Sequence, residues 1–152
     1  MKKLLMLLVG VVFVAGAISG AYAQFAKPEY AIKYRKSVMF LIAQHFGRMG
    51  AMVKEKIPYN QEVFAKNAML VETLSRLPWE ASMLPGTDTG DTTLKSSAFM
   101  QQTEFKEAAQ TFETHTAKIV SVAQSGDFIG IKAQFGEVGK SCKACHTQFR
   151  TK

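Results

Sequence analysis

The only two cysteines of the chain stand near its C-terminus, and they constrain what the rest of the sequence can build. Cys142 and Cys145 are separated by two residues, His146 follows directly, and six residues remain after it. A site formed by these side chains cannot be completed by a downstream segment. Its other walls must come from earlier parts of the chain, so we expect the C-terminal segment to pack along several of them.

The N-terminal segment 1–23 indicates export. Lysines at positions 2 and 3 precede an uncharged apolar run over 4–18, and small residues at 21–23 form a signal-peptidase site. An uncleaved membrane anchor is the alternative, but the run is shorter than the roughly 20 residues of a membrane-spanning helix. We therefore expect 1–23 to be a cleaved signal peptide and 24–152 to be one periplasmic domain, with no membrane insertion after cleavage.

The charge of the exported part is moderate. It carries 17 Lys and Arg against 12 Asp and Glu, a net charge of +5, and the basic residues are scattered without a run of five. Nucleic-acid binding needs a concentrated basic patch, so this pattern does not favour it. A mildly basic surface instead favours an acidic partner protein.

Four segments, 28–55, 60–77, 97–124 and 127–150, have stripe positions spaced alternately by three and four residues, as in the helices of a bundle. The stripe positions are Ile32, Arg35, Met39, Ile42, Phe46, Met49 and Val53; Val63, Asn67, Leu70, Leu74 and Leu77; Phe105, Ala109, Phe112, Thr116, Ile119 and Ala123; and Phe128, Ile131, Phe135, Val138, Cys142, Cys145 and Phe149. The pattern predicts an all-α, antiparallel four-helix bundle, with both cysteines on the inner face of the last helix.

The connections support this arrangement. Asn60 is expected to cap the second helix, Gly126 to end the third and Asp127 to cap the fourth. Residues 78–96 are rich in Gly, Pro, Thr and Asp, which predicts a long loop. A loop of that length in a small domain is usually functional or packed against another element.

Cys-x-x-Cys-His is the attachment signature of c-type haem. Residues three apart on a helix lie nearly on one face, so Cys142 and Cys145 can form thioethers with the two vinyl groups along one edge of a single haem c. His146 can then bind the iron axially. Export agrees with this chemistry, because the attachment takes place outside the cytoplasm.

Three other interpretations of the cysteines are less favoured. A structural zinc site needs two further ligands at matching spacing, and only His45 and His115 remain. A thioredoxin-type pair opens a helix after a strand, whereas this pair lies near the end of a helix. A disulfide suits an oxidising compartment but leaves His146 without a role.

Four stretches carry a resemblance to a known family: CKACHTQFR near the C-terminus, QFAKPEYAIKYRKS at the start of the exported part, HFGRM and LPWEAS. Over essentially all of 24–152 the chain resembles cytochrome c′, the class II c-type cytochrome. The resemblance implies a left-handed four-helix bundle with haem near one end. It also implies a pentacoordinate, high-spin iron with His146 as its only protein ligand, and a periplasmic homodimer that packs through its first two helices.

The resemblance assigns further residues to the site. Arg150, one helical turn past His146, matches the basic residue beside the proximal face of the haem. Arg35 matches an arginine near the propionates, which would explain a charge on an apolar stripe; an arginine that snorkels to the surface is the alternative. Lys36 and Asp91 also match positions at the haem edge, although the loop around Asp91 is one residue longer than the usual pattern.

Met39 matches the position at which the family usually places an apolar residue over the vacant iron face. We interpret it as packing that excludes water, with a sixth iron ligand and a low-spin, electron-transfer cytochrome as the alternative.

The expected ligands are nitric oxide and carbon monoxide, and the haem edge is available to a redox partner protein. No acid or base stands at a credible distal position, so we do not expect an enzyme. His45 and His115 are expected to be partly exposed and hydrogen-bonded.

Overall fold

The computed structural model describes residues 25–151, so the predicted signal peptide and its cleavage site lie outside the described residues. Within that range the regular secondary structure is helical, the connections between the helices are turns and irregular segments, and one isolated β-bridge is present. The helices are α2 (Pro28–Val53), α3 (Gln61–Ser75), α4 (Pro78–Ser82), α5 (Ser97–Met100), α6 (Gln102–Ser125) and α7 (Phe128–Phe149). In the described range, no helix is both long enough and apolar enough to span a membrane.

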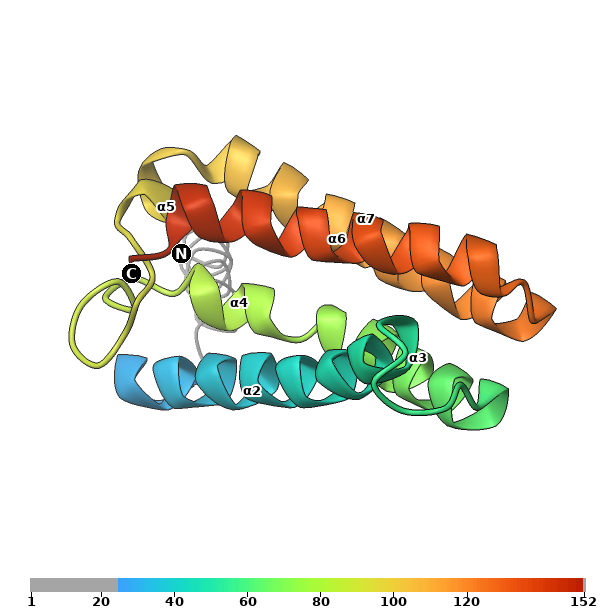
Figure 1. Ribbon diagram of the computed structural model, residues 1–152. Helices are drawn as coiled ribbons and strands as arrows, with labels where there is room; N and C mark the ends of the chain where they lie inside the picture. Colours follow the sequence, from blue (N-terminus) through green and yellow to red (C-terminus); the bar gives the residue numbers. More distant parts are fainter. Residues whose placement is uncertain (1–24, 152) are drawn as a thin grey trace, which may run out of the picture.

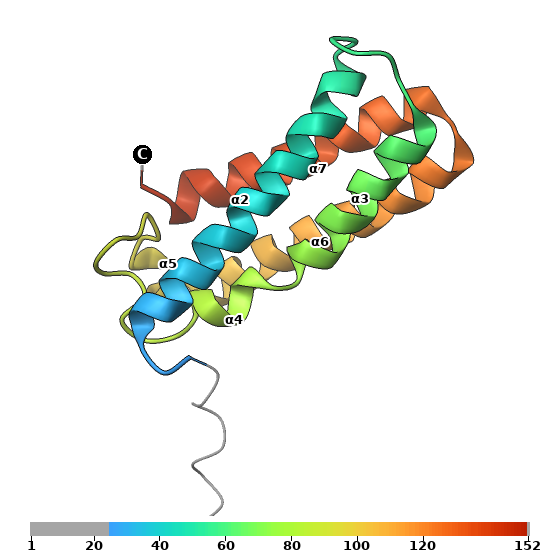
Figure 2. The same cartoon turned by 90° about the horizontal axis from the view of Figure 1, so that it is seen from below.

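The four long helices form the predicted antiparallel bundle (Figure 1). α2 packs against α3, α4 and α7, and α6 packs against α3 and α7. The start of α2, α4, α5 and the end of α7 gather at one end of the bundle, which we call the motif end (Figures 1 and 2). The opposite end holds the connections 54–60 and 126–127, and we call it the turn end.

The turn end follows the expected helix signals. The side-chain oxygen Oδ1 of Asn60 accepts a hydrogen bond from the Val63 amide at 2.9 Å, and Asp127 Oδ1 accepts one from Ile129 at 3.1 Å. Gly126 ends α6 with φ +75°, a left-handed conformation that suits glycine. Each such cap is worth about 1 kcal/mol. All three cap assignments made from the sequence are confirmed.

The core consists of two apolar clusters. The larger one runs along the bundle and includes Val38, Met49, Phe64, Phe112 and Ile131. The smaller one lies at the motif end and is formed by Ala98, Phe105 and Phe149. Trp79 packs against both clusters. The stripes predicted for the first and third helices are confirmed as inward-facing.

The stripe predicted for the second helix is correct at Asn67, which is buried, and at Leu74, which packs against the larger cluster, but wrong at its other three positions. Val63, Leu70 and Leu77 are 48%, 38% and 37% exposed, whereas Phe64 and Val71 are fully buried. This segment has apolar residues on more than one side, so spacing alone does not decide which side faces inward. The burial of the large Phe64 ring between α2 and α6 outweighs burial of Val63 and Leu70.

Two further boundaries differ from the prediction. The region 78–96 is not all loop, because Pro78, which has the backbone angle of a first helical residue, opens α4 and carries Trp79 into the core. The predicted third helix is interrupted at Gln101 (φ −116°, ψ 57°), which separates α5 from α6. The break lets α5 place Ala98 in the smaller cluster.

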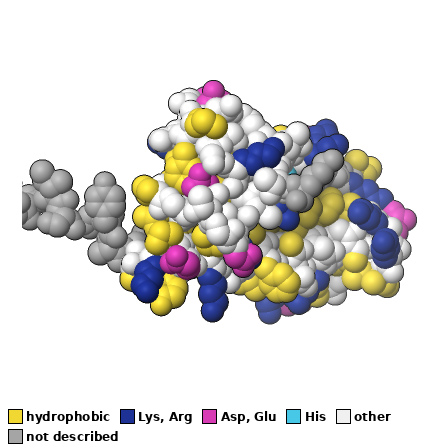
Figure 3. All heavy atoms as spheres, turned by 90° about the vertical axis from the view of Figure 1, so that its left-hand side faces the viewer, with side chains coloured by type: hydrophobic (Ala, Val, Ile, Leu, Met, Phe, Trp, Pro, Cys, Tyr) yellow, Lys and Arg dark blue, Asp and Glu magenta, His cyan; other side chains and the backbone are white. Residues whose placement is uncertain are grey.

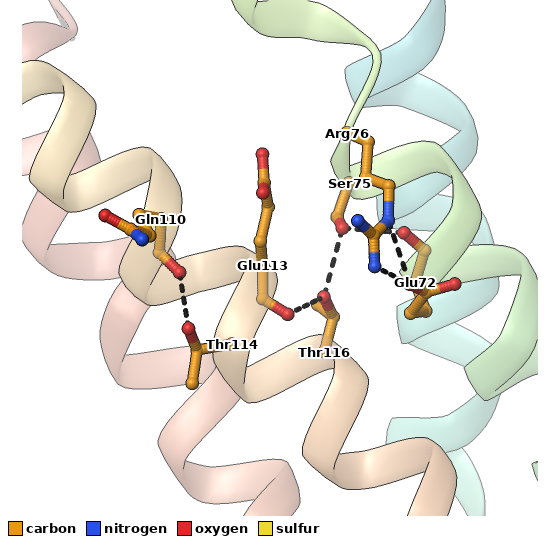
Figure 4. Close-up of polar contacts among 7 residues, drawn as sticks. All are labelled: Glu72, Ser75, Arg76, Gln110, Glu113, Thr114 and Thr116. Carbon is orange, nitrogen blue, oxygen red and sulfur yellow. Dashed lines mark hydrogen bonds and ion pairs between the residues drawn. The ribbon is translucent and has the colours of Figure 1, made fainter.

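A polar contact joins α3 to α6 inside the bundle (Figure 4). Thr116 Oγ1 lies 3.0 Å from Ser75 Oγ and 2.9 Å from the Glu113 carbonyl oxygen, and both hydroxyl-bearing residues are fully buried. On the surface beside it, Arg76 donates to Glu72. Thr116 thus occupies a position on the apolar stripe because its hydroxyl group is paired across the helix interface.

Candidate haem-binding site

The Cys-x-x-Cys-His motif occupies the last turns of α7, at the motif end. Cys142 is half-buried against the larger cluster, and Cys145 is half-buried against the smaller one. Both thiols are free in the structure, and the side chain of His146 is exposed. Among the described residues, no group of three or more His, Cys, Asp or Glu is placed to hold a metal ion. The two sulfur atoms therefore border the two clusters that Trp79 connects.

The surroundings keep the motif uncharged at neutral pH. Burial, and secondly the neighbouring Cys145, raise the pKa of the Cys142 thiol to about 11, and burial raises the pKa of Cys145. Desolvation by the surrounding protein and then the positive charge of Arg150 lower the pKa of His146. A neutral imidazole has a free nitrogen lone pair, which is the form that binds iron.

Arg35 is a buried cation without an acidic partner in the described part of the chain. Its side chain is 6% exposed, so the alternative of a snorkelling surface arginine is wrong. The guanidinium donates to the carbonyl oxygens of Ala81 and Thr87 at 3.1 and 3.0 Å and to Thr92 Oγ1 at 2.6 Å. No ion pair within residues 25–151 includes it, and desolvation lowers its pKa. A buried charge of this kind needs an anionic partner.

At the same end, Trp79 has a buried hydrogen-bond donor that lacks an acceptor within residues 25–151. Its Nε1–H is buried and has no hydrogen-bond partner among the described residues. The ring packs edge-on against Phe105 and Phe112, so the indole is held in one orientation. Trp79 and Ala81, the residue that accepts from Arg35, lie on the same five-residue helix α4. The stretch LPWEAS supports the family resemblance, but sequence reasoning gave its tryptophan no role.

Lys36 and Asp91 meet at the rim of this end. Their side chains form an ion pair of 2.7 Å, and they are 51% and 92% exposed. Lys36 Nζ also donates to the Asp91 carbonyl oxygen at 3.3 Å. An exposed pair of this kind adds little stability. It nevertheless links the loop that follows α4 to α2, beside the Thr92–Arg35 hydrogen bond.

Met39 lies one helical turn after Arg35, half-buried against the larger cluster. Cys142 borders the same cluster from α7. Phe135 and Trp79 pack against it too. The surroundings of Met39 are thus mainly apolar, which suits a side chain that fills space and excludes water.

Arg150 directly follows the last helical residue of α7. Its Nε donates to Thr93 Oγ1 at 3.3 Å, and its backbone forms an isolated antiparallel bridge with Leu94. The end of α7 is therefore tied to the same 83–96 connection that Arg35 and Lys36 hold from α2. No sequence signal indicates these contacts, because the partners stand far apart in the chain.

The two remaining histidines are satisfied elsewhere. His45 Nδ1 lies 2.8 Å from Asn67 Oδ1, and His115 Nδ1 lies 3.2 Å from Gln134 Nε2. Both rings are partly buried. The prediction that His45 and His115 are partly exposed, hydrogen-bonded residues is confirmed.

The residues at the motif end fit a haem of the c type. Such a group needs two thiols, an imidazole, a mainly apolar wall and partners for its two propionates. The first three are present on α7 and in the two clusters. Among the described residues, the buried Arg35 guanidinium has neutral acceptors but no anion, and the Trp79 Nε1–H has no acceptor; propionates would supply both. Figure 3 looks at this end of the molecule, where basic, acidic and hydrophobic side chains are interspersed. The fold and site define the class as a four-helix c-type haem protein.

The comparisons with known proteins identify the family. A family model described as Cytochrome C' matches residues 30–150. Cytochrome c' of Rubrivivax gelatinosus is 45% identical over 130 residues, which cover 85% of this chain and 100% of that protein. Cytochrome c' of Alcaligenes xylosoxydans xylosoxydans is 43% identical over 129 residues, 85% of this chain and 99% of that protein.

Solved structures agree. The crystal structure of the Rubrivivax gelatinosus protein superimposes with a TM-score of 0.80 at 45% identity, covering 84% of this chain and 100% of that one. Cytochrome c prime from Shewanella frigidimarina gives a TM-score of 0.83 at 36% identity, covering 85% of this chain and 100% of that one. The chain belongs to the cytochrome c′ family, a family of c-type haem proteins rather than enzymes.

Proposed function

We propose that this protein is a periplasmic gas-binding cytochrome that holds one haem c through thioethers of Cys142 and Cys145, with His146 as the axial ligand. The observation that carries the proposal is the buried Arg35 guanidinium, which has no acidic partner in the described chain and contacts Ala81 of α4 and Thr92 at the motif end. When bound, the haem supplies an iron centre for small gases and for one-electron transfer. The protein supplies the site around it.

The polar residues of the site would bind the two haem propionates. Arg35 offers a fixed positive charge, and the Trp79 Nε1–H offers a neutral donor. Lys36 and Asp91 close the rim, and their exposed ion pair can open without a large energetic cost. Arg150 stands close to His146 and discourages protonation of the imidazole, since its charge contributes to the lowered His146 pKa.

With a haem held at Cys142, Cys145 and His146, Met39 would be part of the apolar wall that excludes water from the gas-binding side of the site. Its apolar surroundings exclude water and penalise charged ligands, because these would lose their hydration. Nitric oxide and carbon monoxide are small and uncharged, so they enter when the flexible methionine side chain moves aside. Support comes from the relative in Alcaligenes xylosoxidans, of which variants have been solved as a nitric oxide complex and with carbon monoxide bound.

An absorption spectrum tests this proposal. We expect the purified ferrous protein to show a broad, high-spin Soret band that shifts when nitric oxide or carbon monoxide is added. Met39→Ala should raise the association rate of carbon monoxide, because it removes the side chain that the gas must displace. Met100→Ala is the matched control, since Met100 is 77% exposed at the same end of the bundle.

The second candidate is a low-spin electron-transfer cytochrome in which Met39 is the sixth iron ligand. It is supported by the packing of Met39 and Cys142 against one cluster. A sharp six-coordinate spectrum that does not respond to carbon monoxide, and that becomes high-spin in Met39→Ala, would establish it. In either case a partner of acidic surface is the expected electron donor or acceptor, because the exported chain is basic.

The homodimer would form through α2 and α3. Exposed apolar side chains lie on both helices: Phe40, Leu41, Val63, Met69 and Leu70. They include residues that the predicted stripe of the second helix had placed inside. Phe40→Glu should convert a dimer into a monomer in light scattering after gel filtration, while Ile129→Glu at the turn end should not. A monomeric wild-type protein contradicts the dimer and leaves the haem site unaffected.

Cleavage between Ala23 and Gln24 would release the periplasmic domain. Support comes from the extent of similarity, since 85% of this chain matches 99% of the Alcaligenes relative. The mass of the protein isolated from the periplasm should correspond to a start at Gln24 with one haem attached. A mass that still includes the segment 1–23 would contradict cleavage.

A further inference from the structure

The C-terminal end of α7 is unusually well satisfied. The last four carbonyl groups of a helix have no partner within that helix. Here the His146 carbonyl oxygen accepts from the Arg150 amide at 3.1 Å, and the Phe149 carbonyl accepts from the Lys95 amide at 2.8 Å. The Thr147 and Gln148 carbonyls accept from Lys95 Nζ at 3.1 and 3.3 Å. All four carbonyl groups are therefore occupied.

Lys95 supplies most of these bonds. It donates three hydrogen bonds to three consecutive carbonyl groups, one from its backbone and two from its ammonium group. Ser97 Oγ adds a second donor to Gln148 at 3.3 Å. A cation at this position is also favoured by the helix dipole, whose negative end lies at the helix C-terminus. Lys95 thus acts as a C-cap delivered from another part of the chain.

The neighbouring residues extend this attachment. The Thr151 amide donates to the Thr93 carbonyl at 2.8 Å, and Leu94 forms the bridge with Arg150. Leu94 also packs against the smaller cluster, which Cys145 borders. The segment 93–97 therefore contacts α7 through backbone, side-chain and apolar contacts.

The position of this attachment matters because it covers the turn that carries His146. The last turn of a helix frays when its carbonyl groups lack partners. Movement of that turn would change the orientation of the imidazole, and groups that orient a metal ligand tune the metal. The proposed axial ligand is thus held by a residue that is remote in sequence.

We propose that Lys95 is a positioning residue for the haem: by closing the carbonyl groups of Thr147 and Gln148 it fixes the last turn of α7, and with it the orientation of His146. This inference rests on the proposed haem attachment at Cys142, Cys145 and His146. The positioning role is indirect, because the hydrogen bonds of Lys95 go to backbone carbonyl groups rather than to the imidazole.

The test compares Lys95→Met with Lys95→Arg in the haem-loaded protein. Lys95→Met removes the ammonium donors but keeps the backbone hydrogen bond to Phe149, whereas arginine keeps a cationic donor. Lys106→Met is the matched control, because Lys106 is exposed on α6 and forms no ion pair within residues 25–151. The readouts are the iron–histidine stretching band in the resonance Raman spectrum of the ferrous protein and amide hydrogen exchange of 146–151.

Lys95→Met should lower and broaden the iron–histidine band and should speed amide exchange at Arg150 and Thr151 by about tenfold, the loss expected for charge-assisted hydrogen bonds. Lys95→Arg should keep the iron–histidine band and the amide exchange rates close to those of the wild-type protein. Lys106→Met should change neither. An unchanged band and unchanged exchange in Lys95→Met, or an equal change in Lys106→Met, would overturn the proposal.

A wild-type measurement keeps the inference testable even where a variant does not fold. The amides of Lys95 and Thr151 should be protected in the wild-type protein, because both donate across this contact. Exchange at the rate of an unstructured chain would show that the attachment does not form. Absence of covalently bound haem in the wild-type mass spectrum would instead reject the proposed function, so the two failures can be told apart.

Discussion

The two ends of the bundle are built on different principles. At the turn end, Asn60 and Asp127 cap helices with their own side chains, and Gly126 adopts the left-handed angle that ends α6. At the motif end, the helix ends are held by residues far away in the chain, and Arg35 is buried among backbone carbonyl groups. The helix starts at the turn end are capped by their own side chains, although Gln61 also donates to the carbonyl groups of Ala123 and Gln124 from a distant part of the chain. The motif end differs in that it buries a cation without an anionic partner among the described residues.

The two ends also differ in the charge of the buried polar groups that lack a suitable partner. The turn end also has a buried polar atom without a partner among the described residues, the Tyr59 hydroxyl oxygen, and burial raises the pKa of that tyrosine. A neutral hydroxyl without a partner costs about 1–3 kcal/mol and is tolerated. A buried guanidinium without an anion is much less tolerable. The combination of Arg35 and Trp79 therefore indicates a ligand, whereas Tyr59 alone does not.

The largest expected effect comes from removing both thiols. Cys142→Ser combined with Cys145→Ser should abolish covalent haem attachment, since no other cysteine exists in the chain. Mass spectrometry of the denatured protein and its visible spectrum provide the measurement. Retention of covalent haem in this variant would contradict the assignment and remove the distinction between the two ends.

Arg35→Met tests whether the buried charge belongs to the ligand. In the haem-loaded protein it should lower the free energy of unfolding by about 3 kcal/mol or more, because it removes one partner of a buried ion pair. In the cysteine-free variant the loss should be smaller or reversed, since the arginine there lacks its anion. Urea unfolding measures both.

Lys132→Met at the turn end serves as the control for that experiment. Its exposed ion pair with Glu55 should contribute no more than about 1 kcal/mol, with or without haem. An equal loss of stability for Arg35→Met in the two backgrounds would show that the guanidinium serves only the backbone carbonyl groups of Ala81 and Thr87.

A matched pair of substitutions compares the two unpaired donors. Trp79→Phe should lower the unfolding free energy of the haem-loaded protein by about 1.5–3 kcal/mol, the value of a hydrogen bond to a charged group. It should also lower the reduction potential, because the propionate charge near the iron is then less well neutralised. Tyr59→Phe should leave the potential unchanged and the stability unchanged or slightly higher. Equal shifts of the potential in both variants would contradict the role of Trp79.

The smallest effect is expected for a cap at the turn end. Asn60→Ala removes the hydrogen bond to the Val63 amide and should cost about 1 kcal/mol of stability. The visible spectrum and the potential should not change. A spectral change in Asn60→Ala would show that the two ends are coupled.

Much of the fold could be predicted because it rests on local rules. The stripes of the first and third helices, the caps at 60 and 127 and the Gly126 stop depend on spacing and on residue type, and all are confirmed. In the second helix the pattern predicts Val63 inside instead of its neighbour Phe64, because both residues are apolar. Only the packing of α3 between α2 and α6 chooses between them.

The residues of the site also divide into those that the sequence predicts and those that it does not. The motif at 142–146 predicts its own chemistry from spacing, and the placement of a charge at Arg35 on an apolar stripe was a visible anomaly. The partners of Arg35 at 81, 87 and 92 were not predictable, because backbone carbonyl groups have no sequence signature. The role of Lys95 was not predictable either, because its partners are also backbone carbonyl groups.

The sequence by itself determined the helical class, the number of long helices and the residues that can bind a haem, because these depend on periodicity and on the chemistry of neighbouring side chains. The tertiary structure alone decided which side of α3 is buried, that a short helix places Trp79 at the core, and that Lys95 closes the end of α7. These features depend on contacts between segments that are distant in the chain, and such contacts exist only once the bundle has formed.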